Sequence, residues 1–254
     1  MTYMQFNELN QNYKNSIMLW LLSLTVMVFL IIIIGGLTRL TDSGLSMVDW
    51  QPILGTIPPL NNTQWLEVFN DYKLTPEFMY VNKNMTLEEF KYIFWWEWFH
   101  RFFARLIGVV FIIPFIYFLF KKNLNSFFYK RFSIIFTLGL LQALVGWWMV
   151  KSGLSENPYV SPYRLTFHLS NAVIIYALLL WTSIEYYHLK NTNFISIKSK
   201  NIFILISIFL VFITILSGGF MAGSHAGQSF NTYPLMNGKF IPDDIYLEDL
   251  GLLN

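Results

Sequence analysis

The chain has 254 residues, of which 55% are hydrophobic, 19% aromatic and 13% charged, and its formal net charge is +2. This composition excludes an ordinary soluble domain of the same length and indicates an all-α integral membrane protein in a lipid bilayer. No basic tract favours nucleic-acid binding. Because the chain contains no cysteine, disulfides, thiolate ligands and iron–sulfur clusters are excluded, and histidine is the remaining nitrogen ligand for a metal.

Five apolar runs are long enough to cross a bilayer, whose core of about 30 Å takes roughly 20 helical residues. We predict membrane-spanning helices near 17–37, 99–120, 132–150, 164–184 and 202–222. Lysines and arginines gather in alternate connecting segments, and most acids lie in the others. By the positive-inside rule, residues 1–16 form a cytoplasmic N-terminus and the C-terminal end lies outside, in a multi-pass protein of the inner (cytoplasmic) membrane.

The first apolar run ends in a pair of glycines, Gly35 and Gly36, before a long outer segment that we predict over residues 38–98. Paired glycines at the end of a span are typical of close helix packing. Gly44 is typical of a turn. The outer segment contains a short amphipathic piece at 87–93, and two interpretations of it stay open: a cap over a ligand pocket, or a plain extracytoplasmic loop.

Two histidines, His100 and His168, stand a few residues inside the second and fourth predicted spans. At about 1.5 Å per residue they share a depth near the outer face of the membrane. Ionisable groups are rare inside spans, and two imidazoles at one depth on neighbouring helices suit a haem with two axial histidines. We predict that both ligate a haem iron. The alternative is a pair of interfacial histidines that bond to water or backbone.

A carboxylate and three arginines accompany these histidines. Glu97 lies one turn before His100, where it can orient the imidazole, accept a proton or stabilise developing positive charge; the alternative is an ion pair with Arg101. We expect Arg101, Arg105 and Arg164 to be cations for the haem propionates. Arg101 and Arg164 can instead snorkel to the surface, whereas Arg105 lies a turn deeper, which favours a bound anion.

The chain is also similar to itself at an offset of 183 residues (218 minus 35), which aligns Gly35-Gly36 with Gly218-Gly219 and Gly44 with Gly227. Similarity at a fixed spacing indicates a duplication. Residues 17–190 are then an N-terminal four-helix bundle, and 202–254 are the first span and outer segment of a second, incomplete repeat. We therefore expect a truncated, split or fragmentary form of an eight-span protein.

The duplication aligns His225 with Asp42. Asp42 and Arg39 have the spacing of an ion pair at the end of the first span. His225 lies in a glycine-rich outer segment without a second ligand nearby, so we interpret it as a loop histidine whose role is open.

Several ordered motifs are present: Gly35-Gly36-Leu37-Thr38-Arg39-Leu40-Thr41-Asp42-Ser43-Gly44-Leu45-Ser46, Trp50-Gln51-Pro52, Gly55-Thr56-Ile57-Pro58-Pro59, Glu97-Trp98-Phe99-His100-Arg101, Arg105-Leu106-Ile107-Gly108, Gln142-Ala143-Leu144-Val145-Gly146-Trp147-Trp148-Met149-Val150, Tyr163-Arg164-Leu165-Thr166-Phe167-His168-Leu169 and Asn231-Thr232-Tyr233-Pro234-Leu235-Met236-Asn237-Gly238. Together they resemble the haem A synthase family, in its cysteine-free branch from mitochondria and related bacteria. The likeness covers nearly all of the chain after about residue 15.

The resemblance implies two pseudo-symmetric four-helix halves and an oxidoreductase that converts haem O to haem A for cytochrome oxidase, by successive hydroxylation of one porphyrin methyl group to a formyl group. By residue match, it implies that His100 and His168 are the axial ligands on the substrate side and that Glu97 is catalytic. In the family a second pair of histidines holds a haem b cofactor, and that pair is missing from this sequence.

The resemblance implies haem O as substrate, with haem O synthase and cytochrome oxidase assembly factors as partners. No residue indicates the electron donor. Two alternatives stay open. One is a membrane b-type cytochrome that carries electrons through a permanent haem held by the same histidines, although such a carrier has little use for Glu97. The other is a non-catalytic haem-binding fragment.

Overall fold

A computed structural model describes residues 11–50, 54–121, 126–155, 157–190, 202–229, 232 and 234–240. Its long helices are α2 (Gln11–Leu40), α5 (Leu87–Phe120), α6 (Ser126–Gly153), α7 (Pro162–Lys190) and α8 (Ile202–Gly223). The short ones are η1 (Leu54–Thr56), α3 (Asn62–Lys73), α4 (Pro76–Tyr80) and α9 (Ala226–Ser229). Within these residues the only β pairing is an isolated bridge between Met236 and Lys239. The all-α prediction is confirmed.

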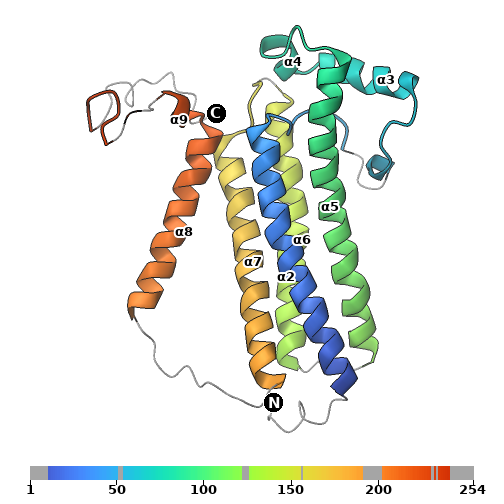
Figure 1. Ribbon diagram of the computed structural model, residues 1–254, viewed down its shortest axis with the longest axis vertical. Coiled ribbons are helices and arrows are strands. Elements are labelled where there is room, and N and C mark those ends of the chain that lie inside the picture. The colour runs from blue at the N-terminus through green and yellow to red at the C-terminus, as the bar shows by residue number, and fades with distance from the viewer. Residues whose placement is uncertain are drawn as a thin grey trace.

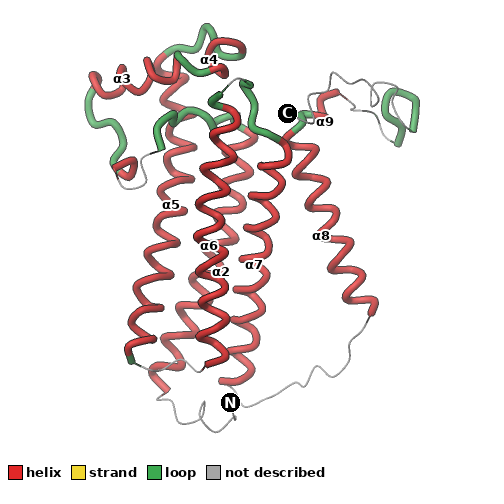
Figure 2. Tube along the Cα trace, turned by 180° about the vertical axis from the view of Figure 1, so that it is seen from behind, coloured by secondary structure: helices red, strands yellow, loops and turns green. Residues whose placement is uncertain are grey.

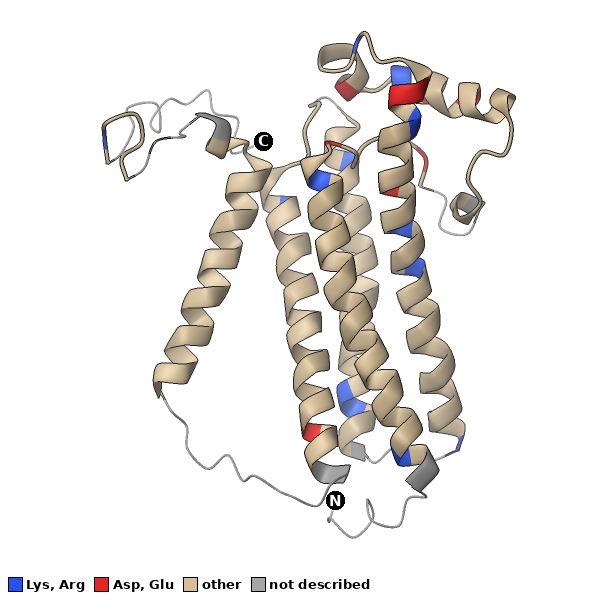
Figure 3. Cartoon of the chain, in the orientation of Figure 1, with Lys and Arg blue, Asp and Glu red and all other residues tan. Residues whose placement is uncertain are grey.

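The five long helices are each apolar and long enough to cross a membrane, so the chain is a multi-pass membrane protein. Figure 3 shows charged residues mainly toward the two ends of the helices, and α5 also carries Arg101 and Arg105 partway along its length. This distribution is the one that a bilayer imposes, because a charge in the hydrocarbon layer loses its hydration.

Helices α2, α5, α6 and α7 form a four-helix bundle, and α8 stands beside it (Figure 1). Within the bundle α2 packs against both α5 and α7, and α6 packs mainly against α7. Helix α8 meets α7 at one end and diverges from it toward the other, as the reverse view confirms (Figure 2). The close contact lies at Gly219 and Gly223, the buried residues of α8.

The helices extend beyond the predicted spans, and the largest difference is at α5. We expected an outer segment over 38–98, but α5 begins at Leu87, so the piece at 87–93 is the first part of a span helix. A capping box starts this helix: Glu89 N–H donates to the Thr86 hydroxyl, and Thr86 N–H donates to the Glu89 carboxylate. The early apolar residues of α5 pack on the outer segment, which explains their place beyond the apolar run.

The outer segment is folded around a small core of its own. Helix α3 begins at the N-cap Asn61 and α4 at the N-cap Thr75, and both helices pack beside the start of α5 (Figure 1). The buried cluster is composed of Trp65, Phe69, Tyr72, Phe90, Ile93 and Phe94. The segment is therefore an ordered cap at one end of the bundle, and the interpretation as a plain loop is wrong.

The apolar core of the bundle occupies the half away from this cap. In α2 its buried members run from Ile17 to Val28, and in α7 from Ile175 to Tyr186; α5 and α6 contribute Phe111, Phe118, Phe128, Phe132 and Ile135. Both predicted histidines lie beyond the end of this cluster, toward the cap. The part of the bundle around His100 and His168 is therefore lined by residues outside this apolar cluster.

Candidate functional site

The structure brings His100 of α5 and His168 of α7 to the same end of the bundle. His100 lies in the half of α5 nearer the cap and His168 in the half of α7 nearer the cap, both beyond the buried apolar cluster. The Nδ1 atom of each imidazole is buried without a hydrogen-bond partner in the described structure. An unpartnered buried polar atom is unfavourable, so neither ring is there to complete a hydrogen-bond network at that atom.

Each imidazole lies against a glycine of another helix. A Cβ built on Gly35 of α2 would lie 3.2 Å from Cε1 of His100. A Cβ built on Gly146 of α6 would lie 3.0 Å from Cε1 of His168. We predicted that Gly35 and Gly36 serve helix packing; the neighbour of Gly35 is instead a candidate ligand, and the packing role stays a prediction. Gly36 has nothing within 4 Å at the equivalent point.

His168 is part of a network of side-chain amide hydrogen bonds that we did not predict from the sequence. The amide nitrogen of Gln142 lies 3.2 Å from His168 Nε2 and donates to His168 O at 3.1 Å. Its oxygen accepts from Asn171 Nδ2 at 2.7 Å, and Asn171 donates to Leu138 O at 3.1 Å. The signal available in the sequence was an amide inside a predicted span, four residues before Gly146 and therefore on the same helix face.

Glu97 is the best-anchored acid of the site. Its side chain is buried, and Oε2 accepts from Ser46 Oγ at 2.7 Å and from the Met47 N–H at 2.8 Å. Oε1 pairs with Arg101, whose guanidinium also donates to Met47 O at 3.1 Å. The ion pair proposed as the alternative role is present, and it fastens the start of the outer segment to α5. A catalytic role for Glu97 stays a prediction.

The other two arginines also donate hydrogen bonds to backbone carbonyl oxygens. Arg105 Nη1 donates to Gly55 O at 3.4 Å, which ties η1 to α5 one turn beyond Arg101. Arg164 Nη1 donates to Trp148 O at 2.9 Å, and its guanidinium lies 4.5 Å from the Trp148 ring centroid. That stacking joins the start of α7 to the end of α6. The predicted propionate contacts of all three arginines remain predictions.

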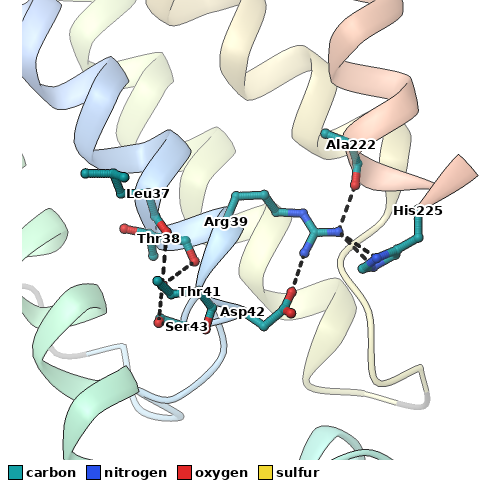
Figure 4. A network of polar contacts seen from close by, with 8 residues as sticks. All are labelled: Leu37, Thr38, Arg39, Thr41, Asp42, Ser43, Ala222 and His225. Atoms are coloured by element: carbon teal, nitrogen blue, oxygen red, sulfur yellow. Dashed lines mark hydrogen bonds and ion pairs between the residues drawn. The ribbon is translucent and has the colours of Figure 1, made fainter. Parts of the chain in front are cut away.

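A network around Arg39 joins the ends of α2 and α8 (Figure 4). The guanidinium donates to Asp42 Oδ1 at 2.8 Å, confirming the predicted ion pair, and to Ala222 O at 2.7 Å. Its Nη2 also lies 2.7 Å from His225 Nε2. Desolvation and the charge of Arg39 lower the pKa of His225, and Asp42 opposes the shift. A neutral imidazole is the form that accepts a bond from a guanidinium.

In the turns after α2 and α8, the residues with left-handed backbone are Asp42 and His225 rather than glycines. Gly44 lies in a turn as predicted, but the positive φ belongs to Asp42, at 46°. His225 has φ 53° and also lies in a turn, where its ring contacts the Tyr159 ring at 4.8 Å between centroids. Asp tolerates this conformation well, whereas for His it is uncommon enough to need fixed surroundings.

A second buried acid lies in the cap. Tyr72 donates to Glu77 Oε2 at 2.9 Å, and Asn82 donates to the Tyr72 hydroxyl at 2.8 Å. Burial raises the pKa of Glu77 to about 8, against the lowering effect of the Tyr72 bond, and Glu97 and Asp42 add to the rise. Burial also raises the pKa of Tyr72. Glu77 therefore holds a proton near neutral pH.

Comparison with known proteins decides the family. Residues 18–252 match COX15-CtaA, described as cytochrome oxidase assembly protein. This chain belongs to the COX15-CtaA family. The resemblance to haem A synthases is confirmed by relatives of that name: "Heme A synthase" of Nitrosospira multiformis is 49% identical over 239 residues, or 92% of this chain and 66% of the relative.

Other COX15-CtaA relatives give the same picture. "Heme A synthase" of Nitrosomonas eutropha is 47% identical, with 95% of this chain and 68% of the relative covered. That of Wolbachia sp. subsp. Brugia malayi is 41% identical, with 97% and 74% covered. The chain spans about two thirds of the length of the curated relatives it matches. No solved structure matches significantly.

The residues of this COX15-CtaA chain fit a haem better than a bare metal ion. Among the described residues no three His, Asp or Glu side chains gather as a metal site. A haem brings its own equatorial nitrogens and asks the protein for two axial ligands at most. His100 and His168 offer two imidazoles at one level, each with an unpartnered Nδ1. Both rings lie at the end of the bundle beyond the buried apolar cluster.

Proposed function

We propose that this chain acts as a haem A synthase, oxidising a methyl group of haem O to a formyl group to give haem A for cytochrome oxidase. The observation that carries the proposal is the pair of buried imidazoles with unpartnered Nδ1 atoms, in a chain of the COX15-CtaA family. His100 and His168 are the proposed axial ligands of the substrate haem. The bound haem supplies the redox-active iron for oxidising the methyl group.

In this proposal Glu97 is a side chain held in one position. The Ser46 hydroxyl, the Met47 N–H and Arg101 all bond to its carboxylate. A carboxylate held in this way needs no reorganisation to stabilise positive charge that develops on a methyl carbon nearby. Arg105 and Arg101 on the same face of α5, with Arg164 at the start of α7, are the proposed cations for the propionates.

The proposal places the protein in the inner (cytoplasmic) membrane with its N-terminus in the cytoplasm. Figure 1 draws the ends of α2 and α8 with the cap at one end of the molecule and the start of α2 at the other. The positive-inside rule then puts the histidine level on the outer side. Haem O synthase is the proposed supplier of substrate, and cytochrome oxidase assembly factors are the proposed recipients of the product.

The test is expression of the 254-residue chain in a host that makes haem O, followed by haem extraction, chromatography and optical spectroscopy. We expect haem O and haem A with a bis-imidazole spectrum in the wild type, and loss of both the spectrum and haem A in His100→Ala and His168→Ala. His188→Ala, at the far end of α7, is the matched control and should behave as wild type. Bound haem O without haem A would instead identify a non-catalytic haem-binding chain.

A second candidate is an electron-carrying b-type cytochrome. The bonds of Glu97 favour it, because an acid that fastens Ser46, Met47 and Arg101 has a structural use that any haem bundle shares. Glu97→Gln separates the two. Under the synthase proposal, haem O accumulates and haem A falls while the bis-imidazole spectrum persists. Under the carrier alternative, only haem b is extracted, and the variant does not change its identity.

A further inference from the structure

We propose that Gly35 and Gly146 are positioning residues for the two axial imidazoles. Because a glycine has no side chain, each brings the backbone of its helix into contact with one ring. This inference rests on the proposed haem site. Two ligands of one iron must approach it from opposite sides, so a displacement of either ring by a few tenths of an ångström changes the coordination. The chain sets both positions in the same way, with a glycine on a helix other than the ligand's own.

The contact at His100 comes from α2. A Cβ on Gly35 would lie 3.2 Å from His100 Cε1 and 3.7 Å from Nδ1. The Cε1–Nδ1 edge of the His100 ring therefore lies against α2. Because α2 packs along α5, the ring has helix backbone on this side and cannot move toward it.

The contact at His168 comes from α6 and is tighter. A Cβ on Gly146 would lie 3.0 Å from His168 Cε1 and 3.5 Å from Nδ1. Gln142 also holds this ring through Nε2 and His168 O. The imidazole is thus located on one side by a glycine and on another by an amide of the same helix, which leaves it less freedom to avoid an added methyl group.

The neighbouring glycines do not share this arrangement. Gly36, Gly108 and Gly139 have nothing within 4 Å of an added Cβ, although they lie in the same helices or beside them. The other crowded glycines face packing residues: Gly153 faces Leu45, Gly219 faces Thr166 and Gly223 faces Pro162. Among these glycines of the described part of the chain, only Gly35 and Gly146 lie against a histidine.

The test compares Gly35→Ala and Gly146→Ala with the matched controls Gly36→Ala and Gly139→Ala, titrating each purified haem-free protein with haem b added as hemin. We expect the controls to give the wild-type bis-imidazole low-spin spectrum. The two test variants should bind hemin about tenfold or more weakly, as overpacking displaces a ligand, with Gly146→Ala the more affected. Their reduced forms should also bind carbon monoxide, which a displaced imidazole no longer blocks.

A double-mutant cycle guards against simple misfolding. Unfolding temperatures of the haem-free protein are measured for Gly35→Ala, His100→Ala and the double variant, because removing the ring makes room for the methyl group. Any destabilisation by Gly35→Ala should disappear when His100 is already alanine. Equal destabilisation in both backgrounds would overturn the proposal, and so would a low-spin spectrum and hemin affinity in Gly35→Ala and Gly146→Ala equal to those of the controls.

Failure of the haem site gives a different result. If the wild type forms no bis-imidazole spectrum, or if His100→Ala and His168→Ala keep it, the proposed function fails and the positioning role falls with it. If the wild type has the spectrum, the histidine variants lose it and the glycine variants keep it, only the positioning role is overturned.

Discussion

The ends of α2 and α8 have similar backbone hydrogen bonds, but their glycines and polar side chains contact different partners. Thr41 donates its N–H and its hydroxyl to Leu37 O at 3.0 and 2.9 Å, and Ser224, 183 positions later, donates both to Phe220 O at 2.9 and 2.8 Å. The next residue has positive φ in both, 46° at Asp42 and 53° at His225. These shared details support the duplication that we propose from the sequence.

The paired glycines show how the two segments diverge. In α2 the first of the pair, Gly35, meets His100 and the second is open; in α8 the first is open and the second, Gly219, would bring a Cβ to 3.0 Å from Thr166. Successive residues of a helix point about 100° apart. The Gly-Gly pair therefore contacts a candidate ligand in α2 and packs against a neighbouring helix in α8. The similarity of the two sequences does not by itself show that the equivalent glycines have the same role.

Between the two segments lies one guanidinium. Arg39 bonds to Asp42 of its own segment and to Ala222 O and His225 of the other, and Ala222 is its equivalent at the same offset (Figure 4). The two left-handed residues thus meet at a single cation. An arginine in one segment and a bare carbonyl in the other make this junction asymmetric.

The strongest test of the α8 contact is Gly223→Ala. The added Cβ would lie 2.6 Å from Pro162 Cα, which is backbone and cannot move aside, so we expect a loss of about 2–3 kcal/mol from overpacking. Thermal unfolding in detergent measures it. Gly218→Ala, which has open space, is the control. An unchanged unfolding temperature for Gly223→Ala would mean that α8 does not dock on α7 as described.

Replacing the shared cation tests whether the two segments depend on each other. Arg39→Gln removes the bonds to Asp42, Ala222 O and His225, and we expect a loss of about 1–2 kcal/mol, reduced from the sum of charged hydrogen bonds because the site is partly exposed. Accessibility of a cysteine introduced at Ser224 should rise as the end of α8 is released. If Asp42→Asn reproduces the whole effect, the link to α8 contributes nothing.

The buried Glu77 in the cap predicts that the stability of the protein falls as the pH rises. The pKa of Glu77 is raised from 4.5 to about 8, so between these values the folded state binds more protons than the unfolded state. Its contribution to stability is fully present below about pH 4.5 and is lost as the pH rises through about 8. Glu77→Gln should flatten this part of the profile in urea unfolding followed by tryptophan fluorescence. A profile unchanged by Glu77→Gln would contradict a protonated Glu77.

His225 predicts the opposite and smaller pH effect. Its pKa is lowered from 6.5, so below that value the unfolded state binds more protons and stability falls as the pH drops through the folded-state pKa. His225→Gln retains an acceptor for Arg39 but cannot titrate, and it should remove this loss. The same measurement with His188→Gln is the control. A wild-type profile with no loss below the ordinary histidine pKa of 6.5 would exclude the His225–Arg39 bond as a stabilising contact.

The sequence by itself determined the all-α membrane fold, five spans and the family, and it predicted two histidine ligands at one level. Long apolar runs and ionisable residues inside them are local signals that any bilayer reads in the same way. It also predicted the Arg39–Asp42 pair, because the partners are one helical turn apart. The start of α5 was missed since its early apolar residues, such as Phe90 and Phe94, bury in a cap rather than in lipid.

Only the tertiary structure decided what each side chain touches. Ser46 and Met47 reach Glu97 across about fifty residues of chain, and Gly35 and Gly146 reach the histidines from other helices. The rotation of each helix about its axis selects which glycine of a pair is crowded and which acid meets a given cation. That rotation results from packing between helices, and so a list of residues along one chain does not contain it.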